Sequence, residues 1–317
     1  MAEEKQYDVI IVGGGPGGLC AGLYASRATR KTVCLEKYLP GGQIAITGEV
    51  EDYLGFELIQ GAELAMKFAD HAKAFGLEIE MEEVEEVYCD GDDRVARCAS
   101  GNIYRAKAVI LSTGGSPVKL GVPGEEKYSG KGVSYCAICD GAFFKDKVIA
   151  VAGGGDAAVE EGTFLTKFAS KVIIIHRRDQ LRAQKIIQQR AFDNPKVEFI
   201  WDSVVESING NGTVVTDLSI KNIKTGETSK LEVGAIFPYI GFHPNSNVTR
   251  EKLNKDENGY ILTDNRMETS VPGIFACGDV RAQLVRQVTN AVGDGTTAAV
   301  AAEKYIEMLE DKEAQRV

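Results

Sequence analysis

The chain has 317 residues, of which 44% are hydrophobic and 26% charged, and its formal net charge is −10. This length exceeds what one ordinary hydrophobic core serves, so two domains are expected. The acidic balance disfavours nucleic acid or a membrane surface as the main partner, because both require basic protein surface. The acidic start MAEEKQYDVIIV lacks the basic residues of a signal peptide, and no apolar run is long enough to span a membrane, so we expect a cytoplasmic protein.

The first predicted element is a buried parallel strand in DVIIVGGGPGG, which leads into a glycine-rich turn and a helix in GLCAGLYASRA. Gly13, Gly15 and Gly18 match the pattern G-x-G-x-x-G. The first glycine permits a tight turn, the second lets the backbone approach a pyrophosphate, and the third lets helix and strand pack closely. The unpaired N–H groups at the helix N-terminus then face the phosphates, which predicts a dinucleotide site.

Glu36, in the second predicted strand TVCLEK, follows Gly13 by 23 residues. At this distance the fold meets the ribose of the nucleotide. A carboxylate accepts hydrogen bonds from free ribose hydroxyls and repels a 2′-phosphate. The first site is therefore predicted to hold a nucleotide whose ribose is not phosphorylated.

The segment EIEMEEVEEVYCD at 78–90 is strongly acidic, and apolar residues alternate within it. A half-exposed strand accounts for this pattern fully. A docking patch for a basic partner is the second interpretation.

Cys136 and Cys139 form a CxxC pair in SYCAICDGAFF, with Asp140 directly after it. A structural zinc site needs four ligands, typically from two such pairs, whereas the other cysteines and the histidines are scattered, so no metal site is expected. Inert core thiols and a redox-active dithiol remain as interpretations. Only the dithiol accounts for Asp140, which can carry protons for sulfur chemistry and can also cap a helix.

The strand and glycine turn recur in KVIAVAGGGDAA at 147–158, with a helix predicted in AVEEGTFLTKFA. Gly153, Gly155 and Ala158 take the three key places. Glycine-rich turns in an ordinary α/β sheet are the alternative, but two such units in one chain are a much more specific signal of dinucleotide binding than one.

His176 follows Gly153 by the same 23 residues, in VIIIHRRDQLR. Arg177, Arg178 and, one helical turn further, Arg182 supply guanidinium groups that suit a phosphate. The second site is therefore predicted to hold NADP(H). A solvated basic start of a helix is the alternative interpretation.

In combination, these motifs are similar to those of the low-molecular-weight thioredoxin reductases, within the two-dinucleotide flavoprotein disulfide reductases. The resemblance spans nearly the whole chain. It is carried by GGGPGG at 13–18, GGQI at 41–44, STG at 112–114, CAICD at 136–140, GGGDAAVEE at 153–161, HRRDQLRA at 176–183, ACGDV at 276–280 and RQV at 286–288.

The resemblance implies an α/β fold with two Rossmann-like dinucleotide-binding domains, the second inserted in the first. The FAD domain would comprise 1–117 and 247–317, and the NADPH domain, 118–246, would carry the CxxC pair. The glycine- and proline-rich crossovers GGSP and PYIGFHPN agree with these joins. The resemblance also implies a homodimer.

Site residues are implied in the same way. For FAD they are Gly13, Gly15, Gly18, Glu36, Gly41, Gly42, Gln43, Asp52, Thr113, Gly114, Gly278, Asp279, Arg286, Gln287 and Val288. For NADPH they are Gly153, Gly155, Asp156, Ala158, Glu160, His176, Arg177, Arg178 and Arg182. Glu160 matches a family residue near the nicotinamide, and a surface charge on a helix accounts for it equally well.

Two positions depart from the family pattern. Asp52 stands where the family usually has asparagine, and an ionised carboxylate accepts hydrogen bonds but cannot donate one to the flavin. A negative charge there would also disfavour an anionic reduced flavin. Val292 stands where a smaller residue is usual.

The implied activity is NADPH-dependent reduction of the disulfide of thioredoxin or a thioredoxin-like protein, through FAD and the Cys136–Cys139 pair. By resemblance, Cys139 is the sulfur near the flavin and Cys136 attacks the partner. Asp140, directly after Cys139, can act as the general acid and base of this chemistry. The dithiol and the NADPH site share one inserted domain, and both must reach the same flavin. Because the dithiol must also reach a bulky protein, we expect the domains to rotate between half-reactions.

Two other functions are consistent with parts of the pattern, and a third, reduction of a peroxiredoxin, is disfavoured. A related flavoprotein could act on a small-molecule dithiol with the same CxxC. Peroxiredoxin-reducing relatives normally carry an extra N-terminal redox domain, whereas this chain starts at the flavin motif. A non-catalytic NADP(H) sensor could use the dithiol to switch partners, and bound flavin would discriminate it from an enzyme.

Overall fold

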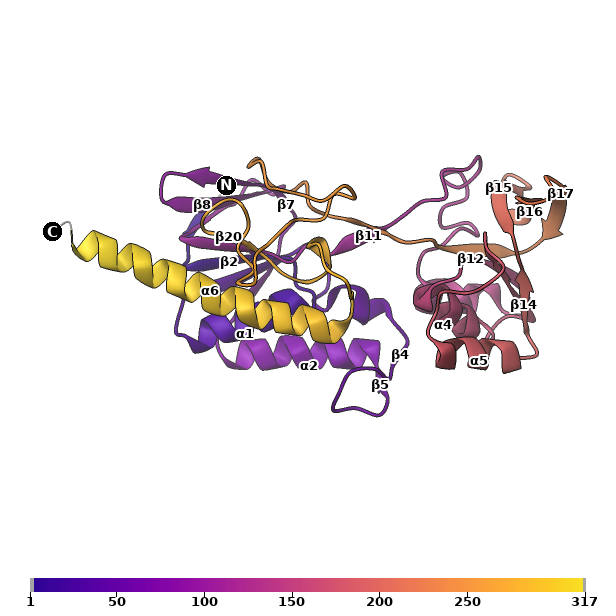
Figure 1. Cartoon of the computed structure of the whole chain (residues 1–317), viewed down its shortest axis with the longest axis horizontal. Coiled ribbons are helices and arrows are strands. Elements are labelled where there is room, and N and C mark those ends of the chain that lie inside the picture. Colours follow the sequence, from indigo (N-terminus) through magenta and orange to yellow (C-terminus); the bar gives the residue numbers. More distant parts are fainter. Residues whose placement is uncertain (1–2, 316–317) are drawn as a thin grey trace. The chain divides into compact units, whose positions relative to one another are not determined.

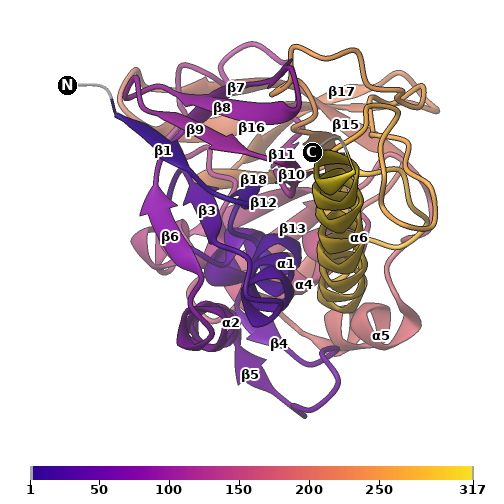
Figure 2. The ribbon, with the colours of Figure 1, turned by 90° about the vertical axis from the view of Figure 1, so that its left-hand side faces the viewer.

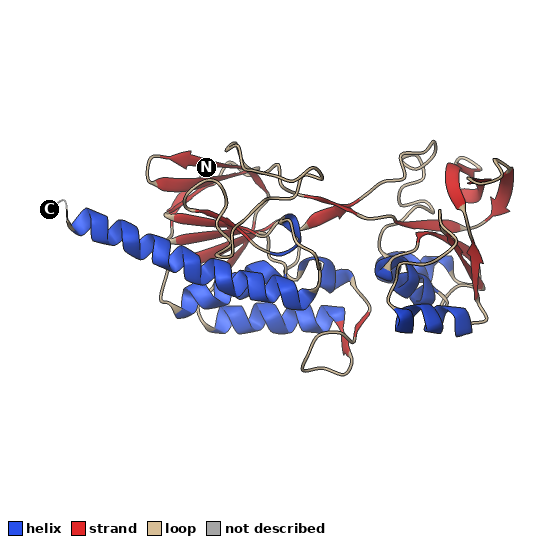
Figure 3. Ribbon diagram, in the orientation of Figure 1, coloured by secondary structure: helices blue, strands red, loops and turns tan. Residues whose placement is uncertain are grey.

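The computed structural model describes residues 3–315, and the chain divides into two compact units. Unit 1 comprises Met1–Ser116 and His243–Val317, and unit 2 comprises Pro117–Phe242. Each unit is an α/β fold built on a parallel sheet with helices against it (Figure 3). The predicted fold class, two Rossmann-like folds with the second inserted in the first, is confirmed.

The central sheet of unit 1 has five parallel strands in the order β20-β10-β2-β3-β6. Their bounds are Val9–Val12 (β2), Thr32–Glu36 (β3), Glu78–Met81 (β6), Ala108–Leu111 (β10) and Ile274–Ala276 (β20). All four residues of β2 are buried, as expected for a strand covered on both faces. The strand order reverses between β2 and β10, and such a switch point is where doubly wound sheets bind ligands.

Helices cover one face of this sheet and a second, four-stranded sheet covers the other (Figures 1 and 2). The helices are α1 (Pro16–Arg27), α2 (Gly61–Ala74) and α6 (Val288–Ala314). The second sheet has the order β1-β9-β8-β7, with β1 at Glu4–Gln6, β7 at Val84–Asp90, β8 at Asp93–Cys98 and β9 at Ile103–Ala106. One apolar cluster lies between the helices and the central sheet and another lies between the two sheets. The glycine turn after β2 is therefore fixed by packing on both sides.

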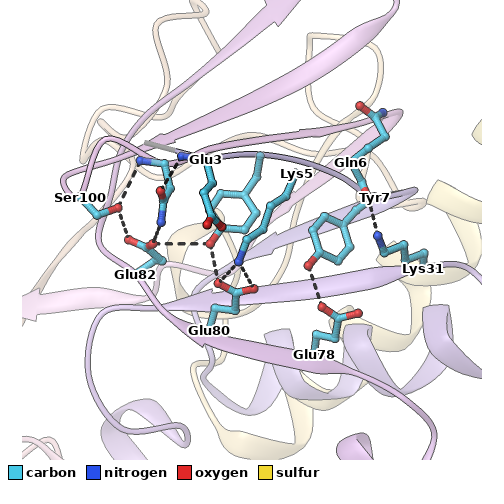
Figure 4. A network of polar contacts seen from close by, with 11 residues as sticks. Glu3, Lys5, Gln6, Tyr7, Lys31, Glu78, Glu80, Glu82 and Ser100 are labelled. Atoms are coloured by element: carbon cyan, nitrogen blue, oxygen red, sulfur yellow. Dashed lines mark hydrogen bonds and ion pairs between the residues drawn. The ribbon is translucent and has the colours of Figure 1, made fainter. Parts of the chain in front are cut away.

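The acidic segment EIEMEEVEEVYCD forms two strands, β6 and β7, that belong to different sheets. The prediction of a single half-exposed strand was wrong in this respect. Its glutamates have partners within unit 1: Tyr7 donates to Glu78 at 2.6 Å and Lys5 donates to Glu80 at 2.7 Å (Figure 4). Tyr104 also donates to Glu80, at 2.6 Å. Burial favours the neutral form of Glu80, but these donors hold its pKa below the usual value. The acidic pattern thus serves contacts between the sheets.

Unit 2 repeats the arrangement with a four-stranded parallel sheet in the order β14-β13-β12-β18. The bounds are Val148–Gly153 (β12), Lys171–Ile175 (β13), Val197–Ile200 (β14) and Ala235–Tyr239 (β18). Its helices are α3 (Ala137–Asp140), α4 (Asp156–Leu165) and α5 (Lys185–Asp193). A three-stranded antiparallel sheet follows, with β15 at Ser203–Gly210, β16 at Val215–Asn222 and β17 at Thr228–Glu232. In both units the strand before the glycine turn is central, so the repeat in the sequence is a repeat in structure.

Short elements complete the chain. They are the 3-10 helices η1 (Gly42–Ile46), η2 (Gly141–Phe144) and η3 (Gly278–Val280) and the paired strands β4 (Glu49–Val50) with β5 (Ile59–Gln60) and β11 (Gly115–Pro117) with β19 (Phe242–Pro244). The chain passes between the units through β11 and β19. Within residues 3–315, no helix is long and apolar enough to cross a membrane.

Candidate functional site

The first glycine turn has the geometry that a pyrophosphate requires. Gly13 follows β2 and has φ of 102°, and a Cβ atom there would overlap the carbonyl oxygen of Ser112. A Cβ at Gly18 would overlap the carbonyl oxygen of Gly13, so α1 packs closely on the turn. Gly15 precedes α1, and a Cβ there would meet no atom within 4 Å. The turn is thus closed on the protein side and open in front of the helix N-terminus, which fits a dinucleotide phosphate.

Glu36 lies at the end of β3 and closes this turn from the other side. Its Oε2 accepts a hydrogen bond from Gly14 N at 2.6 Å, and its Oε1 accepts one from Tyr38 N at 2.8 Å. Each carboxylate oxygen has a second lone pair. The carboxylate is therefore held in place and can still accept a ribose hydroxyl.

The GGQ segment folds back onto the same turn. Gly41 N donates to Gly14 O at 2.7 Å, and a Cβ at Gly42 would lie 3.1 Å from Gly15 Cα. Both glycines have positive φ, 120° and 56°. Gln43 is exposed in η1, and Asp52 is exposed in the turn between β4 and β5.

The turn after β10 is held by a residue that sequence reasoning missed. Asn245 Nδ2 donates to Thr113 O at 2.9 Å, Thr113 Oγ1 donates to Asn245 O at 2.7 Å, and Asn245 N donates to Gly114 O at 2.9 Å. The STG motif and the PYIGFHPN motif thus meet, 132 residues apart. The sequence marked the second motif only as a crossover rich in glycine and proline.

Residues of the ACGDV motif are fixed by an ion pair with α6. Asp294 Oδ2 accepts from Gly278 N at 3.1 Å and pairs with Arg281 Nη1 at 3.2 Å. Both charged side chains are largely buried, at 15% exposure for Arg281 and 10% for Asp294. The sequence pattern indicated neither partner, because no local spacing relates them.

The remaining predicted flavin contacts are Asp279, in η3, and three residues at the start of α6. Burial raises the pKa of Asp279, and the nearby Arg286 opposes that shift. The Arg286 guanidinium lies over the Tyr260 ring, 3.9 Å from its centroid. Gln287 caps α6, and Val288 begins it and is buried.

The second glycine turn repeats the first. Gly153 has φ of 149°, and a Cβ there would overlap the Tyr239 carbonyl oxygen and crowd the Ala158 side chain. A Cβ at Gly155, which precedes α4, would meet only the Arg182 guanidinium, at 4.0 Å. A guanidinium in front of an open helix N-terminus fits a dinucleotide phosphate.

The basic segment after β13 is not helical. Arg182 N and Ala183 N both donate to Gly154 O, at 2.7 and 3.2 Å, and α5 begins only at Lys185. The expected helical turn was wrong, because these backbone donors serve the glycine turn. In the part of the chain that the structure describes, the guanidinium groups of Arg177, Arg178 and Arg182 have no hydrogen-bond or ion-pair partner. Three unpaired cations beside the turn fit a 2′-phosphate.

His176, Asp156 and Glu160 take different places around this turn. His176 is 4% exposed, and its ring packs where a Cβ of Gly154 would lie. Burial and the three neighbouring arginines lower its pKa, so the ring supports the turn as a neutral group. Asp156 Oδ1 accepts from Gln184 N at 2.7 Å and thereby fixes the start of α5. Glu160 is exposed on α4.

Cys136 and Cys139 form a disulfide with a Cα–Cα distance of 5.4 Å. Cys136 caps α3, and its Sγ accepts a hydrogen bond from Cys139 N at 3.2 Å. Cys139 is exposed, whereas Cys136 and Asp140 are half-buried. The N–H of Ala137, between the cysteines, donates to the Tyr239 hydroxyl at 3.0 Å. The pair therefore sits on a short helix tied to the end of β18.

The other thiols lack the environment of reactive cysteines. Burial raises the pKa of Cys277 to about 12, and it raises that of Cys34 further. Burial also raises the pKa of Cys20, whose Sγ lies 3.2 Å from Thr296 Oγ1. Raised thiol pKa values disfavour the thiolate, the reactive form. Among residues 3–315, no group of three or more His, Cys, Asp and Glu side chains is arranged to hold a metal ion.

Comparisons with known proteins agree with this arrangement. The family profile described as pyridine nucleotide-disulphide oxidoreductase matches residues 7–295. The chain is 49% identical to the thioredoxin reductase of Bacillus subtilis (strain 168), over 98% of each chain, and 50% identical to that of Listeria monocytogenes, over 98% of this chain and 97% of the relative. The crystal structure of Lactococcus lactis thioredoxin reductase matches with a TM-score of 0.93 and 46% identity, over 95% of this chain and 99% of the other. That of T. acidophilum thioredoxin reductase matches with a TM-score of 0.91 and 36% identity, over 96% and 99%.

Proposed function

Since the chain belongs to the pyridine nucleotide-disulphide oxidoreductase family, and within it to the thioredoxin reductases, we propose that it reduces the disulfide of thioredoxin or a thioredoxin-like protein with NADPH, through FAD and the Cys136–Cys139 pair. The observation that carries this proposal is the disulfide on α3 in a unit that also holds a dinucleotide turn. The first turn, with the Glu36 carboxylate, would hold FAD. The second turn, with its three unpaired arginines, would hold NADPH.

When bound, FAD supplies two-electron transfer between NADPH and a disulfide. This chain's residues position the nucleotides and carry out the thiol chemistry. The Gly13 and Gly153 turns place helix N-termini against phosphates. The Arg281–Asp294 pair holds the Gly278 turn through the hydrogen bond from Gly278 N to Asp294, so the flavin site would be rigid before the nucleotide binds.

Reduction of the partner proceeds by two thiol–disulfide exchanges. The Cys136 thiolate attacks one sulfur of the partner disulfide, forms a mixed disulfide and releases one partner thiolate. The Cys139 thiolate then attacks Cys136, restores the intrachain disulfide and releases the second partner thiolate. Each released thiolate takes one proton, and Asp140 is the group proposed to move these protons.

The order of the two cysteines is supported by a hydrogen bond. The N–H of Cys139 points at Cys136 Sγ, and a donor to sulfur stabilises a thiolate more than a thiol. Cys136 is therefore the better nucleophile of the reduced pair. Cys139 would face the flavin in the other half-reaction.

Domain rotation between half-reactions is part of the proposal. The dithiol and the NADPH turn lie in unit 2, whereas the FAD turn lies in unit 1. Two chain passages, through β11 and β19, connect the units. A homodimer and a cytoplasmic location remain predictions, and sedimentation of the purified protein checks the first.

The deciding experiment follows NADPH and NADH oxidation with thioredoxin and with small disulfides as acceptors. The proposal expects a yellow protein that NADPH bleaches under anaerobic conditions, turnover with thioredoxin, and strong preference for NADPH. Turnover with small disulfides alone would favour the small-molecule enzyme. A colourless protein without turnover would favour a sensor.

A further inference from the structure

Glu161, on α4, has a carboxylate oxygen that the function described above does not use. Its Oε2 is fully enclosed and accepts no hydrogen bond from any residue in 3–315. Unpartnered buried polar atoms are rare and call for an explanation. Burial, with a smaller contribution from Glu160, raises the pKa of Glu161 to about 7. This carboxyl group therefore changes charge close to neutral pH, which is a property of functional acids.

Tyr239 contacts the redox helix, and its hydroxyl experiences the charge of Glu161. It ends β18, and its hydroxyl accepts the hydrogen bond from Ala137 N, directly after Cys136. Ala137 is 1% exposed, so this bond is shielded from water. Burial raises the pKa of Tyr239, and the charges of Glu161 and Asp140 raise it further. The phenol thus experiences both carboxyl groups, one on α4 and one on α3.

We propose that Glu161 is a positioning residue for the dithiol and acts on it through Tyr239. In this proposal Glu161 takes up a proton when the Cys136–Cys139 disulfide is reduced. This inference rests on the proposed role of that pair as the redox centre. In the balanced step, the disulfide and the Glu161 carboxylate take up two electrons and two protons. The products are one thiol, one thiolate and the Glu161 carboxylic acid. NADPH supplies the electrons, and one of the two protons is stored on Glu161. When the pair reduces its partner, Glu161 gives up that proton.

The physical cause is repulsion between two negative charges. A thiolate at Cys136 would raise the pKa of a nearby buried carboxyl group, and by reciprocity an ionised Glu161 raises the pKa of the Cys136 thiol. Around neutral pH, a state with either the Cys136 thiolate or an ionised Glu161 has a lower free energy than a state with both charges. Proton uptake by Glu161 therefore keeps Cys136 nucleophilic.

The charged groups on the neighbouring elements are few. On α4 itself there are Glu160 and Asp156, the latter accepting from Gln184 N at 2.7 Å. From β18 there is Tyr239, and from α3 there is Asp140. β13 carries Lys171, which pairs with Glu198 at 2.6 Å. α5 carries Lys185, Arg190 and Asp193, the last accepting from Gln189 at 3.0 Å. β12 carries no titratable side chain.

The test measures the Cys136 thiolate directly in full-length Cys139→Ser protein, where Cys136 is the only thiol of the pair. The rate of Cys136 alkylation by iodoacetamide is followed by peptide mass spectrometry from pH 5 to pH 9. In this background, Glu161→Gln should raise the rate about three- to tenfold above pH 7 and leave it unchanged at pH 5, where Glu161 is already neutral. Tyr239→Phe should reduce the effect of Glu161→Gln in the double variant, because the coupling passes through Tyr239.

Two further variants keep the test decisive. Glu161→Asp keeps an ionisable group and should retain the slow rate above pH 7. Glu232→Gln removes an exposed carboxylate of the same unit and should leave the profile unchanged. Superimposable profiles for the parent and Glu161→Gln would overturn the proposal. A uniform change at all pH values would overturn it too, since that would indicate only a structural role. The proposed function is judged separately, by thioredoxin turnover of the unmodified enzyme with NADPH.

Discussion

The backbone N–H of Cys139 donates a hydrogen bond to the Sγ atom of Cys136, at 3.2 Å. The bond comes from the way Cys136 caps the short helix α3, so the two sulfurs of one motif have different surroundings. Cys136 gains a donor that favours its thiolate, and Cys139 is the more exposed residue of the two.

We expect Cys136→Ser and Cys139→Ser each to abolish turnover of thioredoxin while leaving reduction of the bound flavin by NADPH largely intact. Both sulfurs are needed to release a mixed disulfide, whereas neither is needed for hydride delivery to the flavin. Steady-state NADPH oxidation and anaerobic bleaching of the flavin band measure the two steps. Cys89→Ser is the matched control, and full turnover by either active-pair variant would contradict the assignment.

Arg182→Ala should raise KM for NADPH about ten- to hundredfold, the effect of one charge-assisted hydrogen bond, with kcat nearly unchanged. The reason is the position of its guanidinium in front of Gly155, 4.0 Å from where a Cβ would lie. KM for NADH serves as the internal control, because NADH has no 2′-phosphate. An equal rise in KM for NADPH and NADH would contradict the assignment of Arg182 to the 2′-phosphate.

Asp294→Ala should destabilise the protein by about 3–5 kcal/mol, because it leaves Arg281 buried without its partner. It should also lower the flavin content, since Gly278 N loses its acceptor. Urea unfolding and the ratio of flavin to protein absorbance measure the two effects. Asp311→Ala, at an exposed position of the same helix, should change neither.

Local spacing in the sequence predicted both strand–turn–helix units and the CxxC pair, because the requirements of a tight turn act over a few residues. It did not predict the partners that hold these turns: Asn245 for Thr113 and Tyr239 for Ala137 lie 132 and 102 residues away. Such contacts arise when distant strand ends meet at one edge of a sheet, and no periodicity encodes them. The prediction of a helical turn in the basic segment was wrong for a related reason, because Arg182 N donates to the distant Gly154 O and the segment does not form a helix.

The free energy of unfolding should respond to pH through Glu161. Its pKa is raised from 4.5 to about 7 on folding, so the folded state binds more protons than the unfolded state between these values. The neutral carboxyl group makes its whole contribution to the free energy of unfolding below about pH 4.5. This contribution, about 3 kcal/mol, is lost as the pH rises to about 7. Relative to Glu161→Gln, the unmodified protein should therefore be less stable at pH 8 than at pH 5. Urea titrations of both proteins at these pH values measure the difference, and parallel curves would contradict it.

Rotation of the two units predicts a cost for stiffening a crossover. Gly241, beside β19, has φ of 135°, and a Cβ there would meet only Val118 Cγ2 at 3.8 Å. Gly241→Ala therefore causes no clash but restricts the backbone, which disfavours positive φ once a side chain is present. If the units must turn about this segment in every cycle, turnover of thioredoxin by Gly241→Ala should fall several-fold. As long as rotation limits the rate, turnover should also depend on solvent viscosity. Gly226→Ala, in a hairpin of unit 2 with φ of 76° and open space around it, places a side chain at positive φ away from the crossover and should leave turnover unchanged. Equal rates for the two variants, with equal stability, would argue that the crossover does not act as a hinge.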